Sequence, residues 1–164
     1  MQETPIGQVK PGATEGTIRR FRLADAEVVS ALICNTLLIS NSGDYELEAV
    51  NNLARGFSPR AIRSMSRRRQ IWVYEEDGRV MATIAIEDET ISGFFVAPDR
   101  QGQGVGRHLM RFIEEKAREK GLRAIRLSAS VTAVGFYEKL GYSASGDEGV
   151  DDACGRVVPM RKPL

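Results

Sequence analysis

The sequence has few of the residues on which common catalytic and metal sites depend. One histidine, His108, and two cysteines, Cys34 and Cys154, occur among 164 residues. Multi-histidine metal sites, cysteine-rich zinc sites and disulfide frameworks need more of these residues, so the count excludes them and we expect no metal. A serine–histidine triad could be built only around His108. The cysteines form no Cys-x-x-Cys pattern, and both are predicted to be free thiols.

Neither a charge excess nor a long apolar stretch is present. The 23 Lys and Arg residues and the 22 Asp and Glu residues leave a formal net charge of +1. Binding nucleic acid through bulk charge requires a basic excess, so this balance argues against nucleic acid as a partner. No apolar run approaches the roughly 20 residues that a transmembrane helix needs, and the first residues do not resemble a secretory signal. We therefore expect a cytoplasmic protein with no membrane partner.

Length and composition predict one globular domain. A chain of this size, with 42% hydrophobic and 27% charged residues, can bury a sufficient core without a disulfide or a metal. Residues 1–15 contain glycine and proline among polar residues, and we expect a mobile N-terminal lead-in there. Residues 16–164 are predicted to form the single domain, because no linker or repeat interrupts them.

Hydrophobic periodicity predicts a mixed α/β fold. Alternating or continuous apolar residues predict strands at 17–22, 70–74, 80–86, 91–96 and 124–129, with two weaker strands between 142 and 162. Helical spacing predicts helices at 25–37, 44–69, 109–120 and 133–140, the second interrupted at Gly56 and restarted at Ser58-Pro59. Asp77-Gly78 predicts a tight hairpin and Lys120-Gly121 a helix end. The predicted order is β-α-α-β-β-β-α-β-α-β-β.

A loop with three alternating glycines joins the strand ending at Val96 to the next helix. The first turn of a helix leaves about four N–H groups unpaired, and its dipole favours negative charge. Glycine lets a phosphate approach those amides, so Gly102, Gly104 and Gly106 predict an anion site. A P-loop is excluded because it needs Gly-Lys followed by Ser or Thr five residues after its first glycine, whereas Gly102 leads to Arg107 and His108. A dinucleotide fingerprint starting at Gly104 would need glycine at 109, where leucine stands. The alternative is that the glycines only form a tight turn.

Two segments together resemble the GCN5-related N-acetyltransferases, the GNAT superfamily. Gln101-Gly102-Gln103-Gly104-Val105-Gly106 follows the family's Gln/Arg-x-x-Gly-x-Gly/Ala pattern, and Phe136-Tyr137-Glu138-Lys139-Leu140-Gly141-Tyr142 is similar to its Phe-Tyr-x-x-x-Gly-Phe/Tyr signature. They occur in the family's order and separation, and the specific motifs cover roughly residues 91–142. The resemblance implies a mixed, mostly antiparallel, twisted sheet of roughly six to seven strands with about four helices. It also implies an acetyl-CoA-dependent N-acetyltransferase.

The resemblance implies where acetyl-CoA binds. It would lie in a V-shaped gap between the strands ending near Val96 and Ala129, and Gly93 would mark a bulge that opens the gap. Backbone groups of Phe94, Phe95 and Val96 would pair with the pantetheine arm, and an amide near Phe95 would polarise the thioester. The amides of the loop would hold the pyrophosphate; the loop comprises Gln101, Gly102, Gln103, Gly104, Val105, Gly106 and Arg107. Ser130 stands where many members have an asparagine that touches the cofactor.

The resemblance implies fewer catalytic residues than cofactor-binding residues. The resemblance implies direct attack of an amine on the thioester, with Tyr137 as the acid that protonates the departing thiolate; the alternative is a core tyrosine. A phenol stays protonated at neutral pH, as this role requires. Glu89 is a candidate base, or part of a solvated turn. Arg107 and Arg111 are either phosphate partners or solvated helix residues.

The acceptor remains open at this stage. The arginines at 60, 63, 67, 68 and 69 are either a solvated helix end or a patch for an acidic substrate or RNA, whereas Glu148, Asp151 and Asp152 could attract a cationic amine. We expect a small-molecule or peptide amine as acceptor. The alternatives are a non-catalytic acyl-CoA-binding or sensing domain, and a binding module for nucleic acid or protein. Family members are often dimers, which raises a homodimer as a further expectation.

Overall fold

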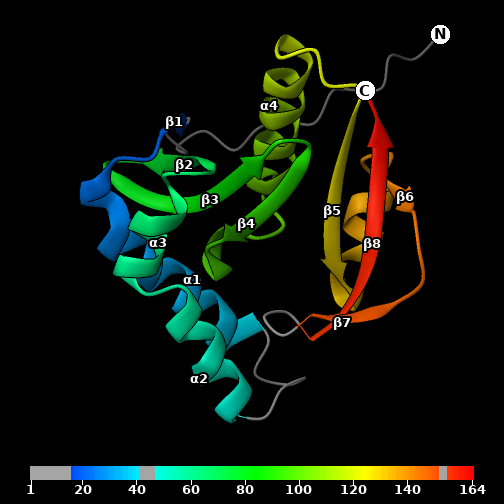
Figure 1. Ribbon diagram of the computed structural model, residues 1–164. Helices are drawn as coiled ribbons and strands as arrows, with labels where there is room; N and C mark the ends of the chain where they lie inside the picture. Colours follow the sequence, from blue (N-terminus) through cyan, green and yellow to red (C-terminus); the bar gives the residue numbers. More distant parts are fainter. Residues whose placement is uncertain (1–15, 41–46, 152–154) are drawn as a thin grey trace, which may run out of the picture.

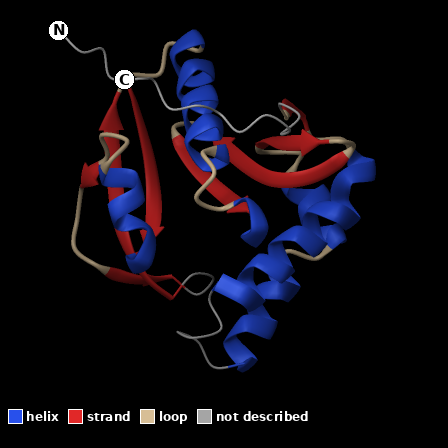
Figure 2. Cartoon of the chain, turned by 180° about the vertical axis from the view of Figure 1, so that it is seen from behind, coloured by secondary structure: helices blue, strands red, loops and turns tan. Residues whose placement is uncertain are grey.

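The computed structural model describes residues 16–40, 47–151 and 155–164 of the chain. The predicted lead-in at 1–15 lies outside these ranges, as do Cys154 and Asp152. A twisted sheet runs through the described part, with helices on both of its faces (Figures 1 and 2). The α-helices are α1 (Ala26–Ser40), α2 (Leu47–Gly56), α3 (Pro59–Met65), α4 (Val105–Glu119) and α5 (Val134–Glu138). The strands are β1 (Thr17–Arg20), β2 (Gln70–Glu76), β3 (Arg79–Glu87), β4 (Thr90–Val96), β5 (Ala124–Ser130), β6 (Ser143–Ala144), β7 (Gly149–Asp151) and β8 (Gly155–Pro163).

The strands are arranged in the order β1-β2-β3-β4-β5-β8-β6, and β7 also pairs with β8. Every pair is antiparallel except β4 with β5, so the predicted mixed and mostly antiparallel sheet is confirmed. The sheet has eight strands in the described residues, more than predicted, and the region 44–69 contributes two separate helices. The additional strands are short. β6 has two residues and β7 has three, too few for an alternating pattern to reveal.

Local signals set several element ends as predicted. Asp77 and Gly78 both have positive φ, 48° and 74°, which matches the two-residue hairpin turn between β2 and β3. The Ser58 hydroxyl accepts a hydrogen bond from the Ala61 amide at 3.3 Å, and Pro59 opens α3. At Asp25 the chain differs slightly from prediction: a short 3-10 turn, Leu23–Asp25, precedes the start of α1.

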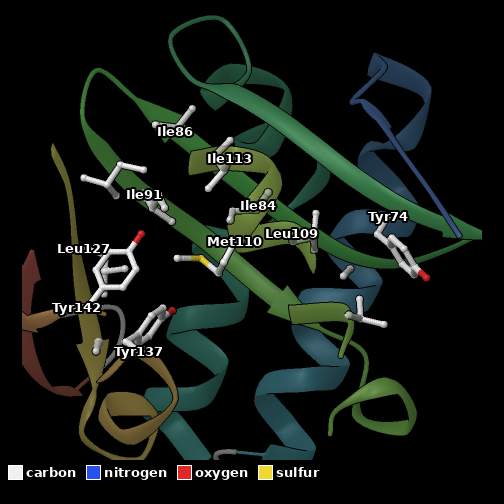
Figure 3. Packing of buried hydrophobic residues seen from close by; sticks show 14 of the residues in the cluster. Tyr74, Ile84, Ile86, Ile91, Leu109, Met110, Ile113, Leu127, Tyr137 and Tyr142 are labelled. Atoms are coloured by element: carbon white, nitrogen blue, oxygen red, sulfur yellow. The ribbon is translucent and has the colours of Figure 1, made fainter. Parts of the chain in front are cut away.

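The core has two parts, one on each face of the sheet. On the α4 side, Leu109, Met110 and Ile113 are fully buried and pack with Ile84 and Ile91 of the central strands (Figure 3). On the opposite face, residues of α1 and α3 pack on β2 and β3; the buried members are Val29, Ile33, Leu37, Ile62, Ile71, Val73 and Ala85. α4 therefore covers one side of the sheet with its apolar face, and α1 and α3 cover the other.

The two parallel strands at the centre separate soon after they meet. β4 and β5 share one register pair, Thr90 with Arg126, and the Arg126 amide donates to the Glu89 carbonyl at 2.9 Å. Beyond this pair β4 continues alongside β3, and β5 alongside β8, so the strands splay toward their C-terminal ends (Figure 1). The bulge predicted at Gly93 is present. Gly93 has a φ of +56°, and the β3–β4 register shifts by one residue there.

Candidate active site

The glycine loop forms a set of backbone donors at the start of α4. Gly102 and Gly104 have φ values of +72° and +89°, in the region that favours glycine, and Gly104 caps the helix without a side-chain bond. The His108 amide makes the first helical bond, to the Gly104 carbonyl at 2.9 Å. The amides before it in the first turn therefore lack helical acceptors, and the dipole of this 15-residue helix adds positive potential.

The side chains of the loop support its shape. Gln101 Nε2 donates to the Val96 carbonyl at 3.0 Å, and Gln103 Nε2 donates to the Asp99 carbonyl at 2.7 Å. These bonds join the loop to the end of β4 and to the short turn that follows it. The loop from 101 to 104 is exposed, so its amides are accessible to an anion.

The two signature segments, distant in the sequence, meet at the open end of the gap. A Cβ atom at Gly106 would lie 3.4 Å from the ring tips of both Phe94 and Phe136. Those rings belong to β4 and α5, and their centroids are 6.1 Å apart. The fold therefore brings one side of the gap, the glycine loop and the other side of the gap into contact, and a side chain larger than a methyl group at 106 would collide with these rings.

Tyr137 lies at this junction and is 8% exposed. Its ring makes edge contacts with Phe136 at 5.1 Å and with Tyr142 at 5.9 Å, and lies 6.4 Å from Phe94. Figure 3 shows its hydroxyl oxygen on the side of Met110 of α4. Tyr137 is therefore a well-packed phenol beside the gap, and this geometry leaves open both the proton donor and the core residue.

The structure gives other predicted residues different surroundings. Ser130 ends β5 half-buried, with its hydroxyl 3.4 Å from that of Thr132. Glu89, the candidate base, forms an ion pair with Arg126 at 2.8 Å at the closed end of the gap. His108 is exposed, and its ring lies 6.1 Å from that of Tyr74. Arg107 and Arg111 of α4 are also exposed.

Comparison with known proteins gives the family. Residues 41–164 match the family described as acetyltransferase (GNAT) domain. The chain belongs to the GNAT acetyltransferases. It is 29% identical over 148 residues to the peptidyl-lysine N-acetyltransferase YjaB of Escherichia coli (strain K12), across 88% of this chain and 92% of that protein.

Solved structures of other N-acetyltransferases have the same fold as this chain. A GCN5-related N-acetyltransferase from Rhodopseudomonas palustris superposes with a TM-score of 0.83 at 20% identity, covering 96% of this chain and 100% of that one. The PaiA N-acetyltransferase of Thermoplasma acidophilum, in complex with coenzyme A, gives a TM-score of 0.77 at 18% identity, with coverage of 92% and 100%. At these identities the likeness concerns the fold.

As a GNAT acetyltransferase, the chain is an acyltransferase that uses acetyl-CoA as donor and an amine as acceptor. The residues present fit that donor, because the glycine loop exposes its backbone amides. At 102 and 104 the positive φ would strain any residue that has a Cβ. Family membership favours the enzyme over the non-catalytic alternatives. Among the helices of the described ranges, none has the length and apolarity needed to cross a bilayer.

The arginines predicted to be either a solvated helix end or a substrate patch lie in and after α3, and only some of them form ion pairs. Arg63 pairs with Glu27 at 2.5 Å and Arg69 with Glu87 at 3.0 Å, whereas Arg60, Arg67 and Arg68 are exposed. A cavity of about 160 Å³ lies at this edge, lined by Arg20, Phe21, Leu23, Ser66, Arg69 and Ile71. Of the predicted acidic group, Glu148 pairs with Arg156. Glu27 and Glu87 therefore neutralise part of the arginine patch at 60–69.

One polar group of this GNAT domain escaped the sequence analysis. Glu114 of α4 is 5% exposed and binds Tyr142 and Lys162. Its signal was present in the sequence, because position 114 falls on the same helical face as the apolar residues 110 and 117. A carboxylate on an apolar stripe needs a partner, which periodicity alone does not identify.

Proposed function

We propose that this acetyltransferase transfers the acetyl group to the primary amine of a lysine side chain in a peptide or protein. The name of the Escherichia coli relative supports this acceptor, and the alignment with that relative spans most of both chains. Small-molecule amines are the second acceptor class. The arrangement that carries the proposal is the splayed β4–β5 pair, with the glycine loop on one side and Tyr137 on the other.

The binding of acetyl-CoA is assigned to backbone more than to side chains. Amides of residues 102–107 hold the pyrophosphate at the N-terminus of α4. The edge of β4 at Phe94, Phe95 and Val96 pairs with the pantetheine arm as an added strand would, since β4 has a partner strand there only on its β3 side in the described residues. Ser130, at the end of β5, contributes a hydroxyl from the other side of the gap. We assign these functions to a single domain at 16–164.

Tyr137 is assigned as the general acid. Acetyl-CoA, when bound, supplies an acyl group already activated as a thioester. An amide near Phe95 polarises its carbonyl, and the amine nitrogen forms the new C–N bond and loses a proton to solvent. As the C–S bond breaks, Tyr137 donates its hydroxyl proton to the sulfur. A general acid must hold its proton at neutral pH, and a phenol is a side chain of that kind.

A panel of acceptors tests the proposed function. Acetyl-CoA is mixed with a lysine peptide, with the same peptide in which lysine is replaced by glutamine, and with small amines such as spermidine; released CoA is measured. We expect release with the lysine peptide and background release with the glutamine peptide. Turnover with small amines alone would replace the peptide acceptor by the second class. Absence of acetyl-CoA binding in calorimetry would overturn the site assignment.

A cytoplasmic location, a homodimer and the absence of a resident metal belong to the same proposal. Light scattering of the purified chain measures its molar mass and so separates a monomer from a homodimer. Elemental analysis measures bound metal. A monomeric mass would overturn the homodimer, and a stoichiometric metal would overturn the metal-free mechanism.

A further inference from the structure

A buried carboxylate connects α4 to the half of the sheet that carries β5 and β8. Glu114 accepts a hydrogen bond from the Tyr142 hydroxyl on Oε1, at 3.1 Å, and from Lys162 Nζ on Oε2, at 2.8 Å. Arg118 Nη2 lies 3.9 Å from Oε2. Both oxygens of the carboxylate are therefore satisfied, and its charge is balanced by Lys162 at close range.

This connection matters because the sheet is nearly divided at the gap. β4 and β5 share one register pair, and α4 lies over the two halves with its apolar residues in the common core. From α4, the Glu114 side chain bonds both to Tyr142, which follows α5, and to Lys162 of β8. A buried ion pair is a costly way to hold a helix, and an apolar residue would serve packing as well. The two hydrogen bonds of Glu114 are directional, so they fix a geometry that apolar packing would leave less defined.

Glycine at 141 makes room for the connection. Gly141 has a φ of +91°, so the chain turns sharply between α5 and Tyr142. A Cβ at Gly141 would lie 3.4 Å from Lys162 Cε, which means that the lysine stem passes over this position on its way to Glu114. The Lys162 ammonium also lies 5.6 Å from the centroid of the Tyr142 ring.

Tyr142 in turn supports Tyr137. Its amide donates to the Tyr137 carbonyl at 3.1 Å, and its ring meets the Tyr137 ring edge-on at 5.9 Å. The rings of Phe94 and Phe136 also contact Tyr137, and these two rings have no hydrogen-bonding atoms. Tyr142 is 3% exposed, and its hydroxyl bond to Glu114 fixes the orientation of the ring against which Tyr137 packs. Burial and the Glu114 carboxylate raise the Tyr142 pKa, so its hydroxyl remains a donor throughout the neutral range.

We propose that Tyr142, held by Glu114 and Lys162, is a positioning residue that fixes the Tyr137 phenol at the edge of the acetyl-CoA gap. The proposal rests on the proposed role of Tyr137 as general acid. It assigns a function to the aromatic residue that ends the second signature segment and to a helix carboxylate that lies outside both segments.

A double-mutant cycle tests whether Tyr142 acts through Tyr137. Tyr142→Phe keeps the ring and deletes the hydroxyl; kcat and the KM for acetyl-CoA are measured with a lysine peptide. We expect kcat to fall about tenfold with KM changed less than about twofold. In the Tyr137→Phe background the same substitution should leave kcat unchanged within about twofold. Additive losses in the double variant, or an unchanged kcat in the single variant, would overturn the proposal.

Two controls separate positioning from stability. Tyr74→Phe removes another buried tyrosine hydroxyl, on β2, and should lower stability without changing kcat. Glu114→Gln keeps an oxygen that accepts from Tyr142, and should retain kcat within about threefold, whereas Glu114→Leu should match Tyr142→Phe. If Tyr142→Phe does not fold, the comparison of Glu114→Gln with Glu114→Leu replaces it. Equal kcat values in these two variants would reject the positioning role.

A readout that needs no turnover distinguishes this proposal from the proposed function. The four tyrosines of the chain are labelled as 3-fluorotyrosine, and the Tyr137 fluorine signal is identified by its loss in Tyr137→Phe. Tyr142→Phe and Glu114→Leu should shift or broaden that signal, whereas Tyr74→Phe should not. An unmoved signal would overturn the positioning role even in an active enzyme. A moved signal with an unchanged kcat in Tyr137→Phe would instead reject Tyr137 as the acid.

Discussion

Arg126 and Glu89 are joined twice at the closed end of the gap. The Arg126 amide donates to the Glu89 carbonyl at 2.9 Å, and the guanidinium pairs with the Glu89 carboxylate at 2.8 Å. This junction is where the parallel strands β4 and β5 meet before they separate. The candidate base is thus committed to an ion pair beside the one register pair, and the backbone bond is the part that holds the strands.

Glu89→Gln tests whether the Glu89 carboxylate is needed for stability or for catalysis. Both side chains of the ion pair are substantially exposed, at 59% and 41%, so we expect the free energy of unfolding to change by less than about 1 kcal/mol. We also expect kcat with a lysine peptide to remain within about threefold of the wild-type value, because the backbone bond is kept. A loss of activity at neutral pH that is rescued at high pH would identify Glu89 as the base and contradict the expectation.

Substitutions at Gly106 probe the space at the mouth of the gap. Gly106→Ala places a Cβ 3.4 Å from two flexible ring tips, and acetyl-CoA affinity should change less than about threefold. Gly106→Val adds two methyl groups to that Cβ. These groups would displace Phe94 and Phe136, and the affinity for acetyl-CoA should fall more than about tenfold. Calorimetric titration measures both. Gly56→Ala is the control, because nothing lies within 4 Å of a Cβ there. Equal affinities in the alanine and valine variants would show that the loop does not depend on this packing.

Tyr137→Phe removes the proposed acid and keeps the ring contacts. General acid catalysis contributes typically 10²–10⁴-fold, so we expect kcat to fall about 100-fold while the KM for acetyl-CoA stays within about threefold. Steady-state kinetics with the lysine peptide measures both constants. A Tyr137→Phe enzyme with full kcat would leave Tyr137 as a core residue, the alternative that the sequence also allows.

Asp25→Asn should weaken the protein in a pH-dependent way. Hydrogen bonds from the Arg19 guanidinium, at 2.8 and 3.0 Å, hold the pKa of the buried Asp25 carboxyl below its usual value. Because the folded pKa is the lower one, the contribution of Asp25 is complete above the unfolded pKa near 3.9 and is lost as pH falls through the folded pKa. We expect Asp25→Asn to cost about 2 kcal/mol at pH 7 and less below pH 4.

Urea denaturation across pH 2.5–7 measures this difference. Glu27→Gln is the matched control, since Glu27 pairs with Arg63 on the exposed surface and should affect stability much less. A difference between Asp25→Asn and wild type that is the same at pH 3 and pH 7 would show that the carboxylate charge is not what Arg19 uses.

The sequence by itself determined the features that depend on neighbouring residues. Asp77-Gly78 adopts the turn that only small or flexible residues enter readily, Ser58-Pro59 begins a helix, and the glycine loop opens α4. The two signature segments also indicated the family, because each preserves a local pattern of glycines and aromatics at fixed spacing. These signals require no knowledge of which strands pair.

Only the tertiary structure decided which distant residues meet. The pairing of Glu89 with Arg126 and of Glu114 with Tyr142 and Lys162 follows from strand order, which periodicity does not encode. β6 and β7 exist because β8 offers a long antiparallel edge to segments too short to form strands alone. The gap itself arises because β4 and β5 each continue with another partner strand after one shared pair. Local residue patterns specify turns, caps and apolar faces, whereas long-range pairing specifies where the chemistry can occur.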